Sequence, residues 1–240
     1  MDLRSAFDQV VSAPWFVAID VIGTVAFALS GITIARSERY SLFGAFVLAA
    51  LPAVGGGLLM DLIANRNPVG ILAQPSYVIS IVVVVLSAKM VMAFIDLARG
   101  RFLFFFDLAY LYVRLQSKVK VRTLLLFWDS VGLASFTVTG VFTAIQFDCA
   151  PLIIWGPVFA VLNAAFGAVL RDVFRADANN PILKGSFYAE VAFLWGLLLV
   201  LFLSWQPEPW AVAVGVAVTI AGATGMRTWL AFRGYQAPMF

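Results

Sequence analysis

The sequence contains no histidine, a single cysteine (Cys149) and few charged residues, which make up 12% of its 240 residues. Without histidine the chain lacks the commonest acid–base group and a common zinc ligand, and one cysteine cannot form an intrachain disulfide. The formal net charge of +3 is too small to indicate binding to nucleic acid. The carboxylates are scattered and no nucleophile stands beside a base, so we expect neither an enzyme nor a cofactor.

Hydrophobic residues, by contrast, make up 62% of the chain. A soluble domain of this size could not bury so much apolar surface. The apolar runs are continuous rather than alternating, which is typical of membrane-spanning helices and not of barrel strands. The sequence therefore predicts an all-α polytopic membrane protein. Its seven expected transmembrane helices cover about 15–35, 41–60, 76–97, 124–145, 151–174, 187–205 and 210–232.

Basic residues are distributed unequally between the two sides that seven spans define. The side of the N-terminus carries Arg4 and Arg66, and Lys89 lies within the third span. The side of the C-terminus carries Arg36, Arg39, Arg99, Arg101, Arg114, Lys118, Lys120, Arg122, Arg171, Arg175, Lys184, Arg227 and Arg233. Because cytoplasmic loops are enriched in basic residues, we expect the N-terminal tail (1–14) outside and the C-terminus in the cytoplasm.

The connection at 99–123 is both aromatic and basic, and it includes the run from Phe104 to Phe106. It is too short and too charged to cross a bilayer. These features favour an interfacial helix lying on anionic lipid headgroups, with an ordinary cytoplasmic loop as the alternative.

A motif in the first apolar segment recurs in the fourth. The pairs separated by 109 residues are Asp20 and Asp129, Gly23 and Gly132, Phe27 and Phe136, and Gly31 and Gly140. The pairs separated by 111 residues are Gly56 and Gly167, Asp61 and Asp172, and Tyr77 and Tyr188. The conserved order indicates a duplication, with one unit at 15–98, a second at 124–206, and an extra helix with the C-terminus at 207–240.

Each of the two units contains three predicted spans. Because three is odd, the second unit enters the membrane from the opposite side, which gives a 3+3 inverted repeat plus one extra helix. Folds of this kind place a polar pathway between the units, at helices broken in corresponding positions. The candidates are the second helix at its glycines and the fifth helix around 163–167.

Several short motifs together carry a resemblance to a known family. They are Phe27-Ala28-Leu29-Ser30-Gly31, the run Gly55 to Gly57 with Asp61, Gly132-Leu133 with Phe136 and Gly140, Arg171-Asp172, Tyr188-Ala189, and Arg227. With them the chain resembles the prokaryotic branch of the trimeric intracellular cation (TRIC) channel family, which overlaps the glycine-transporter-domain membrane proteins. The resemblance covers nearly the whole chain, about 15–235.

This resemblance implies a homotrimer in a prokaryotic inner (plasma) membrane, in which each protomer has its own pore. The pore would pass K⁺ or Na⁺ between helices 2 and 5, with membrane lipids as further partners. The family pattern is a glycine triplet followed by Arg-Asp in both units. Here Met60 replaces the arginine of the first unit, and Phe166-Gly167-Ala168 replaces the triplet of the second. Because the two units differ in this motif, we do not expect the two helices to contribute equally to a gate.

The glycines Gly55, Gly56 and Gly57, with Pro52 upstream, are poor helix formers, so we expect the second helix to kink or unwind there. Freed carbonyl oxygens would then face a hydrated cation. The alternative is close packing of two helices through small residues. Gly167 is the matching position in the fifth helix.

Charged and hydroxyl side chains supply the remaining candidates. Arg171 and Asp172 would gate the pore, or Arg171 would extend to the membrane surface as an anchor. The carboxylates Asp20 and Asp129 would concentrate cations, or each would rest at headgroup depth near the start of its helix. The pore-lining candidates on helices 1 and 4 are Ser30, Gly31, Thr139 and Gly140, with helix packing as the alternative.

Two functions fit this sequence. The first is a monovalent cation channel that is K⁺-permeable and gated at glycine-broken helices 2 and 5. The second is a secondary transporter of a small amino acid such as glycine, with which an inverted repeat is equally compatible. Channel flux would be fast and voltage-dependent, whereas transport would saturate with substrate.

Overall fold

The computed structural model describes residues 10–11, 13–101, 121–176, 182–206 and 208–237, without the side chains of 95–101, 121 and 122. The expected interfacial helix at 99–123 and the N-terminal tail lie largely outside these residues. Within them the chain forms eight helices: α2 (Pro14–Ser37), α3 (Leu42–Ile63), α4 (Gly70–Ala73), α5 (Ser76–Arg101), α7 (Val121–Gln146), α8 (Leu152–Phe174), α9 (Ala189–Trp205) and α10 (Pro209–Arg233).

Each of the seven apolar segments predicted from the sequence forms a helix. Six of them are long and apolar enough to cross a membrane, namely α2, α3, α5 up to Phe94, α7 from Thr123, α8 and α10. The remaining helix, α9, is apolar but has only 17 residues. The fold is therefore that of an all-α membrane protein. The short helix α4 was not predicted.

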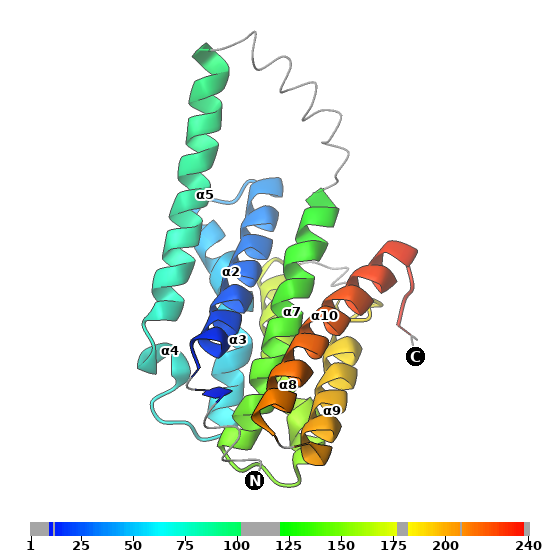
Figure 1. Cartoon of the computed structure of the whole chain (residues 1–240). Helices are drawn as coiled ribbons and strands as arrows, with labels where there is room; N and C mark the ends of the chain where they lie inside the picture. Colours follow the sequence, from blue (N-terminus) through cyan, green and yellow to red (C-terminus); the bar gives the residue numbers. More distant parts are fainter. Residues whose placement is uncertain (1–9, 12, 102–120, 177–181, 207, 238–240) are drawn as a thin grey trace.

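The four helices α2, α3, α7 and α8 form the centre of the bundle and make its most extensive contacts. Consecutive long helices alternate in direction, and α5 stands at one edge while α9 and α10 pack at the other (Figure 1). One end of the bundle holds α4, the first turns of α2 and the last turn of α3, and we call it the α4 end. The opposite end holds the last turns of α2 and α8, and we call it the Arg171 end.

The predicted unwinding of the second and fifth helices is wrong. In the structure, α3 continues through Pro52 and the three glycines, and α8 is likewise one helix. A Cβ atom on Gly56 would lie 2.3 Å from the carbonyl oxygen of Asn163, and one on Gly167 would lie 2.7 Å from that of Leu51. The missing side chains therefore allow the two backbones to touch, which is the packing alternative. Pro52 costs α3 a single hydrogen bond.

Glycines in the other two central helices pack in the same reciprocal way. Gly23 of α2 lies against the ring of Phe136, and Gly132 of α7 lies against the ring of Phe27. These two rings meet edge to face with their centroids 5.1 Å apart. A side chain at Gly31 would strike the carbonyl of Leu48, and one at Gly140 would strike the carbonyl of Phe159. The contacts of one unit therefore recur in the other at nearly the same sequence offset.

The outer face of α5 is apolar and largely uncovered. Exposed side chains along it include Ile79, Val83, Met90 and Phe94. Only 11% of the residues in its candidate span are buried within the chain. A face of this kind suits contact with lipid tails or with another membrane helix.

Candidate functional site

A cavity of ≈ 200 Å³ opens among the central helices at the α4 end. Its polar lining residues come from α2, α3, α5, α7, α8 and the chain around α4, and they are Asp20, Asp61, Arg66, Gln74, Tyr77, Thr139, Thr143, Gln146 and Asn163. Apolar side chains such as Phe16 and Phe142 complete its walls. A polar cavity between membrane helices is a place where water and ions can enter.

Two carboxylates at this cavity are held by polar groups. The hydroxyl of Tyr77 donates a hydrogen bond to Asp20. Asp61 accepts a hydrogen bond of 2.6 Å from the backbone N–H of Gly70, and it lies 3.4 Å from Nη1 of Arg66. The mouth thus combines two acidic groups with one basic group, each fixed in position.

Replacing Tyr77 with phenylalanine is expected to lower the free energy of unfolding by about 1–3 kcal/mol, because the partly buried carboxylate of Asp20 loses its donor. Thermal unfolding of the purified protein in detergent measures the change. Tyr235→Phe is the matched control, since Tyr235 is 54% exposed. Equal stability of the two variants would contradict this assignment.

The cavity ends at Asn163 of α8. Its Nδ2 donates to the hydroxyl of Thr139 (2.8 Å) and to the carbonyl of Phe136 (3.1 Å). Its side-chain oxygen faces α3 at Gly57, where an added Cβ would lie 3.3 Å away. Just beyond this point Gly56 meets the α8 backbone. The polar lining of the cavity therefore ends near the middle of the bundle, where the backbones of α3 and α8 are in contact.

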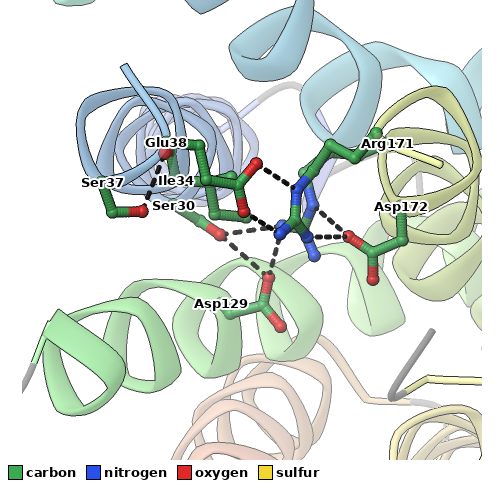
Figure 2. Close-up of polar contacts among 8 residues, drawn as sticks. Ser30, Ile34, Ser37, Glu38, Asp129, Arg171 and Asp172 are labelled. Carbon is green, nitrogen blue, oxygen red and sulfur yellow. Dashed lines mark hydrogen bonds and ion pairs between the residues drawn. The ribbon is translucent and has the colours of Figure 1, made fainter. Parts of the chain in front are cut away.

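A second polar cluster, centred on Arg171, lies at the other end of the bundle and joins side chains of α2, α7 and α8 (Figure 2). Its guanidinium donates from Nη1 to Asp129 Oδ1 (3.2 Å) and to the hydroxyl of Ser30 (3.0 Å), and from Nε to Asp172 Oδ1 (2.9 Å). Ser30 in turn donates to Asp129 at 3.1 Å. Arg171 is only 4% exposed. It does not extend to the membrane surface, so that alternative is wrong.

Toward the end of α8 the cluster continues to an exposed ion pair. Nη1 of Arg175 lies 3.2 Å from Asp172 Oδ1, and the same guanidinium binds Glu38 at the end of α2. Burial alone would lower the pKa of Arg175, but Glu38 and Asp172 outweigh it and raise the pKa. Arg175 therefore stays charged and ties α2 to α8.

A fully buried tyrosine and a second buried arginine flank the Arg171 cluster. The guanidinium carbon of Arg227 in α10 lies 5.0 Å above the ring of Tyr188, a cation–π arrangement. Tyr188 is 0% exposed and Arg227 is 6% exposed. This contact packs α10 onto the start of α9.

The two ends carry related residues with one difference. Asp61 has Arg66 as its basic partner, and Asp172 has Arg175. Tyr77 faces the first end, and Tyr188 the second. Where the first unit has Met60, however, the second has Arg171, whose side chain fills the space between the carboxylates. One end is thus an open cavity and the other a closed ionic lock.

The structure brings the predicted site residues into two groups and separates others from them. Asp20, Gly57, Asp61 and Thr139 line the cavity at the α4 end, and Ser30, Asp129, Arg171 and Asp172 form the cluster at the Arg171 end. The positions that serve helix contact instead are Gly31, Gly55, Gly56, Gly140 and Gly167.

Sequence reasoning did not assign Tyr77, Arg66, Arg175 or Glu38 to a site, and it included Asn163 only as the start of the expected break at 163–167. A signal existed for Tyr77, since it recurs as Tyr188 in the second unit. Arg66 and Arg175 also carried a signal, since each follows its acidic partner within five residues. Asn163 stands at the position of Pro52 in the other unit, so no repeated residue pointed to it.

Among the described residues there is no group of three or more His, Cys, Asp or Glu side chains suited to a metal ion. The arrangement instead consists of a cavity with acidic groups at its mouth and Asn163 at its polar floor, and of a buried arginine cluster beyond that floor. These features define the class of the protein as a polytopic helical membrane protein with a polar cavity and a buried ionic cluster among its central helices.

Comparison with known proteins gives the family. The family model described as glycine transporter matches twice, at residues 17–94 and at 126–204. A UPF0126 membrane protein of Deinococcus radiodurans is 32% identical over an alignment of 208 residues that covers 78% of this chain and 85% of that protein. The UPF0126 inner membrane protein YadS of Escherichia coli K12 is 27% identical over 75% of each chain. The chain belongs to this glycine transporter (UPF0126) family.

Solved structures agree on the fold. The TRIC trimeric intracellular cation channel orthologue from Rhodobacter sphaeroides is 26% identical, with a TM-score of 0.65 over 90% of this chain and 99% of that one. A structure reported for conductance through TRIC cation channels is 22% identical, with a TM-score of 0.69 over 94% and 97%. The fold is therefore that of the prokaryotic TRIC channels.

Proposed function

We propose that the chain is a K⁺-permeable monovalent cation channel with one pore per protomer of a homotrimer. The observation that carries this proposal is that α2, α7 and α8 each contribute residues both to the acidic cavity at one end and to the buried arginine cluster at the other. The 26% identical relative of the same fold, described as a trimeric cation channel, supports it. The proposed location is the inner membrane, as the name of YadS states for that relative.

The proposal includes seven spans arranged as a 3+3 inverted repeat plus α10. The double match of one family model supports the repeat, because the two matches begin 109 residues apart. The reciprocal contacts of Gly23 with Phe136 and of Gly132 with Phe27 support it too. In this arrangement α9 is the sixth span. The proposed topology keeps the basic loops in the cytoplasm and the N-terminus outside, so the α4 end faces out.

The proposed conduction begins with hydrated cations that collect at Asp20 and Asp61. Water in the cavity keeps them solvated, and the oxygens of Thr139 and Asn163 replace part of the hydration shell at the floor. Beyond the floor, the positive charge of Arg171 opposes passage while it is bound to Asp129 and Asp172. Opening requires the guanidinium to leave this position.

The gate we propose is a shift between two intact helices rather than an unwound segment. The backbones of α3 and α8 touch at Gly56 and Gly167, so a small slide there would change the width at Gly57 and Asn163. Because α8 also carries Arg171 and Asp172, such a slide would move the lock along with the constriction.

The purified protein in planar lipid bilayers tests the proposal. With KCl on both sides we expect unitary currents. With a KCl gradient we expect a reversal potential near the equilibrium potential of K⁺, as for a cation-selective pore. The absence of unitary currents from protein that remains folded and assembled would reject the channel.

A second candidate is a transporter of glycine or a similar small amino acid, as the family description suggests. The cavity favours it in one respect, because Asp20, Asp61 and Arg66 offer both signs of charge to a zwitterion. Saturable glycine uptake into proteoliposomes, together with an absence of unitary currents, would establish this function in place of the first.

A further inference from the structure

Two adjoining grooves lie at the Arg171 end, on the side of the chain away from the cluster. The first, of ≈ 350 Å³, is bordered by the end of α2, the start of α3 and α5, and its basic lining residues are Arg36, Arg39 and Lys89. The second, of ≈ 270 Å³, runs between α3 and α5 and has an apolar lining that includes Phe43 and Phe46. Leu42 and Val85 line both grooves, so the two are continuous.

The basic end of this double groove carries three cationic side chains, Arg36, Arg39 and Lys89. All three cationic side chains are exposed, and none is paired with an acidic side chain in the part of the chain that the structure describes. Glu38 stands in the same turn but binds Arg175 across the top of α8. Lys89 lies within the candidate span of α5, where a charged side chain needs a partner or an escape to the surface.

We propose that the double groove binds an anionic phospholipid of the surrounding bilayer. Its phosphate group would lie among Arg36, Arg39 and Lys89, and one acyl chain would lie in the apolar groove between α3 and α5. Charge complementarity selects an anionic headgroup, because three cations at a membrane surface attract anionic lipid. The continuity of a cationic and an apolar groove matches the order of headgroup and tail along a lipid molecule.

The backbone at Arg39 provides a clean test. This residue has φ = +61°, the left-handed conformation that follows a helix and that glycine adopts most readily. The N–H of Tyr40 closes the turn onto the carbonyl of Ala35 at 2.9 Å. Arg39→Gly therefore removes a cation and relieves the backbone at the same position, so a loss of binding cannot be attributed to unfolding.

The experiment measures lipid binding to purified, delipidated protein by native mass spectrometry. The probes are phosphatidylglycerol and phosphatidylcholine with identical acyl chains. For the wild type we expect at least tenfold tighter binding of phosphatidylglycerol. For Arg39→Gly combined with Lys89→Gln, we expect the preference to fall to twofold or less. Arg233→Gln removes an exposed cation at the same end but outside the grooves, and should keep the full preference.

Three outcomes of the lipid-binding experiment would overturn the proposal, and a fourth comes from a further variant. The first is a wild type with no preference for phosphatidylglycerol, and the second is a double variant that keeps the preference. The third is an Arg233→Gln variant that loses the preference as fully as the double variant. The last result would indicate a diffuse surface charge rather than a built groove. If a Phe43→Arg variant kept lipid binding but dissociated an oligomer, the apolar groove would be an interface with a second copy of the chain. The proposal would then fail as well.

Discussion

Replacing Arg171 with methionine should raise the K⁺ current of the protein several-fold and lower its free energy of unfolding by about 3–5 kcal/mol. The current should rise because the only positive charge bound between Asp129 and Asp172 in the described cluster is removed from the path. Stability should fall because two buried carboxylates lose their shared partner. Methionine is the residue that the first unit has at this position, as Met60. Bilayer recordings and thermal unfolding measure the two effects.

The two effects are separable by a second substitution. Asp129→Asn in the Arg171→Met background neutralises the carboxylate that lost its ion-pair partner Arg171, while Asp172 keeps Arg175 as its partner. This double variant should recover a large part of the lost stability and should still conduct more than the wild type. Arg171→Lys keeps the charge but not the forked geometry, and should conduct like the wild type at reduced stability. If a folded Arg171→Met protein gave the same currents as the wild type, Arg171 would not be part of the gate.

Gly56→Ala should destabilise the protein by about 1–3 kcal/mol, because the new methyl group would overpack a backbone contact. Its Cβ would lie 2.3 Å from the carbonyl oxygen of Asn163, and neither backbone can yield without moving a whole helix. Separation of α3 from α8 would also disturb the floor of the cavity at Gly57. Thermal unfolding gives the stability, and bilayer recording gives the change in open probability.

The matched control for this substitution is Gly225→Ala in α10. A Cβ at Gly225 meets nothing within 4 Å, so alanine should be neutral or stabilise by up to about 1 kcal/mol through helix propensity. If Gly56→Ala were as stable as Gly225→Ala, the close contact between α3 and α8 would be wrong.

Most of the fold was readable from the sequence, because each long apolar run must form a helix to satisfy its backbone in lipid. The seven predicted segments are seven helices, with ends that differ by a few residues. The helix break at Gly55–Gly57 was predicted wrongly for a physical reason. Intrinsic propensity disfavours glycine in a helix, but at this position close contact with the α8 backbone stabilises a helix that contains glycine. That contact is between two helices, so it is not visible when the sequence of one helix is considered alone.

The site was predictable only in part. The repeat pointed to Asp20, Asp129 and Asp172 because polar residues recurring in two copies indicate equivalent places. It did not reveal that Arg171 is buried, since a basic residue near a helix end is ordinarily a surface anchor. Nor did it reveal that Asn163 forms the floor of the cavity. Both depend on which side chains of α2 and α7 face α8.

The most direct measurement uses the fact that Cys149 is the only cysteine of the chain. In a Cys149→Ala background, Thr139→Cys places a thiol at the floor of the cavity, and Val138→Cys places one in the apolar core beside it. A small cationic thiol reagent applied from the α4 end should reduce the K⁺ current of Thr139→Cys several-fold and leave that of Val138→Cys unchanged. If Thr139→Cys is labelled and its current persists, ions do not pass through this cavity and the proposed pathway is wrong.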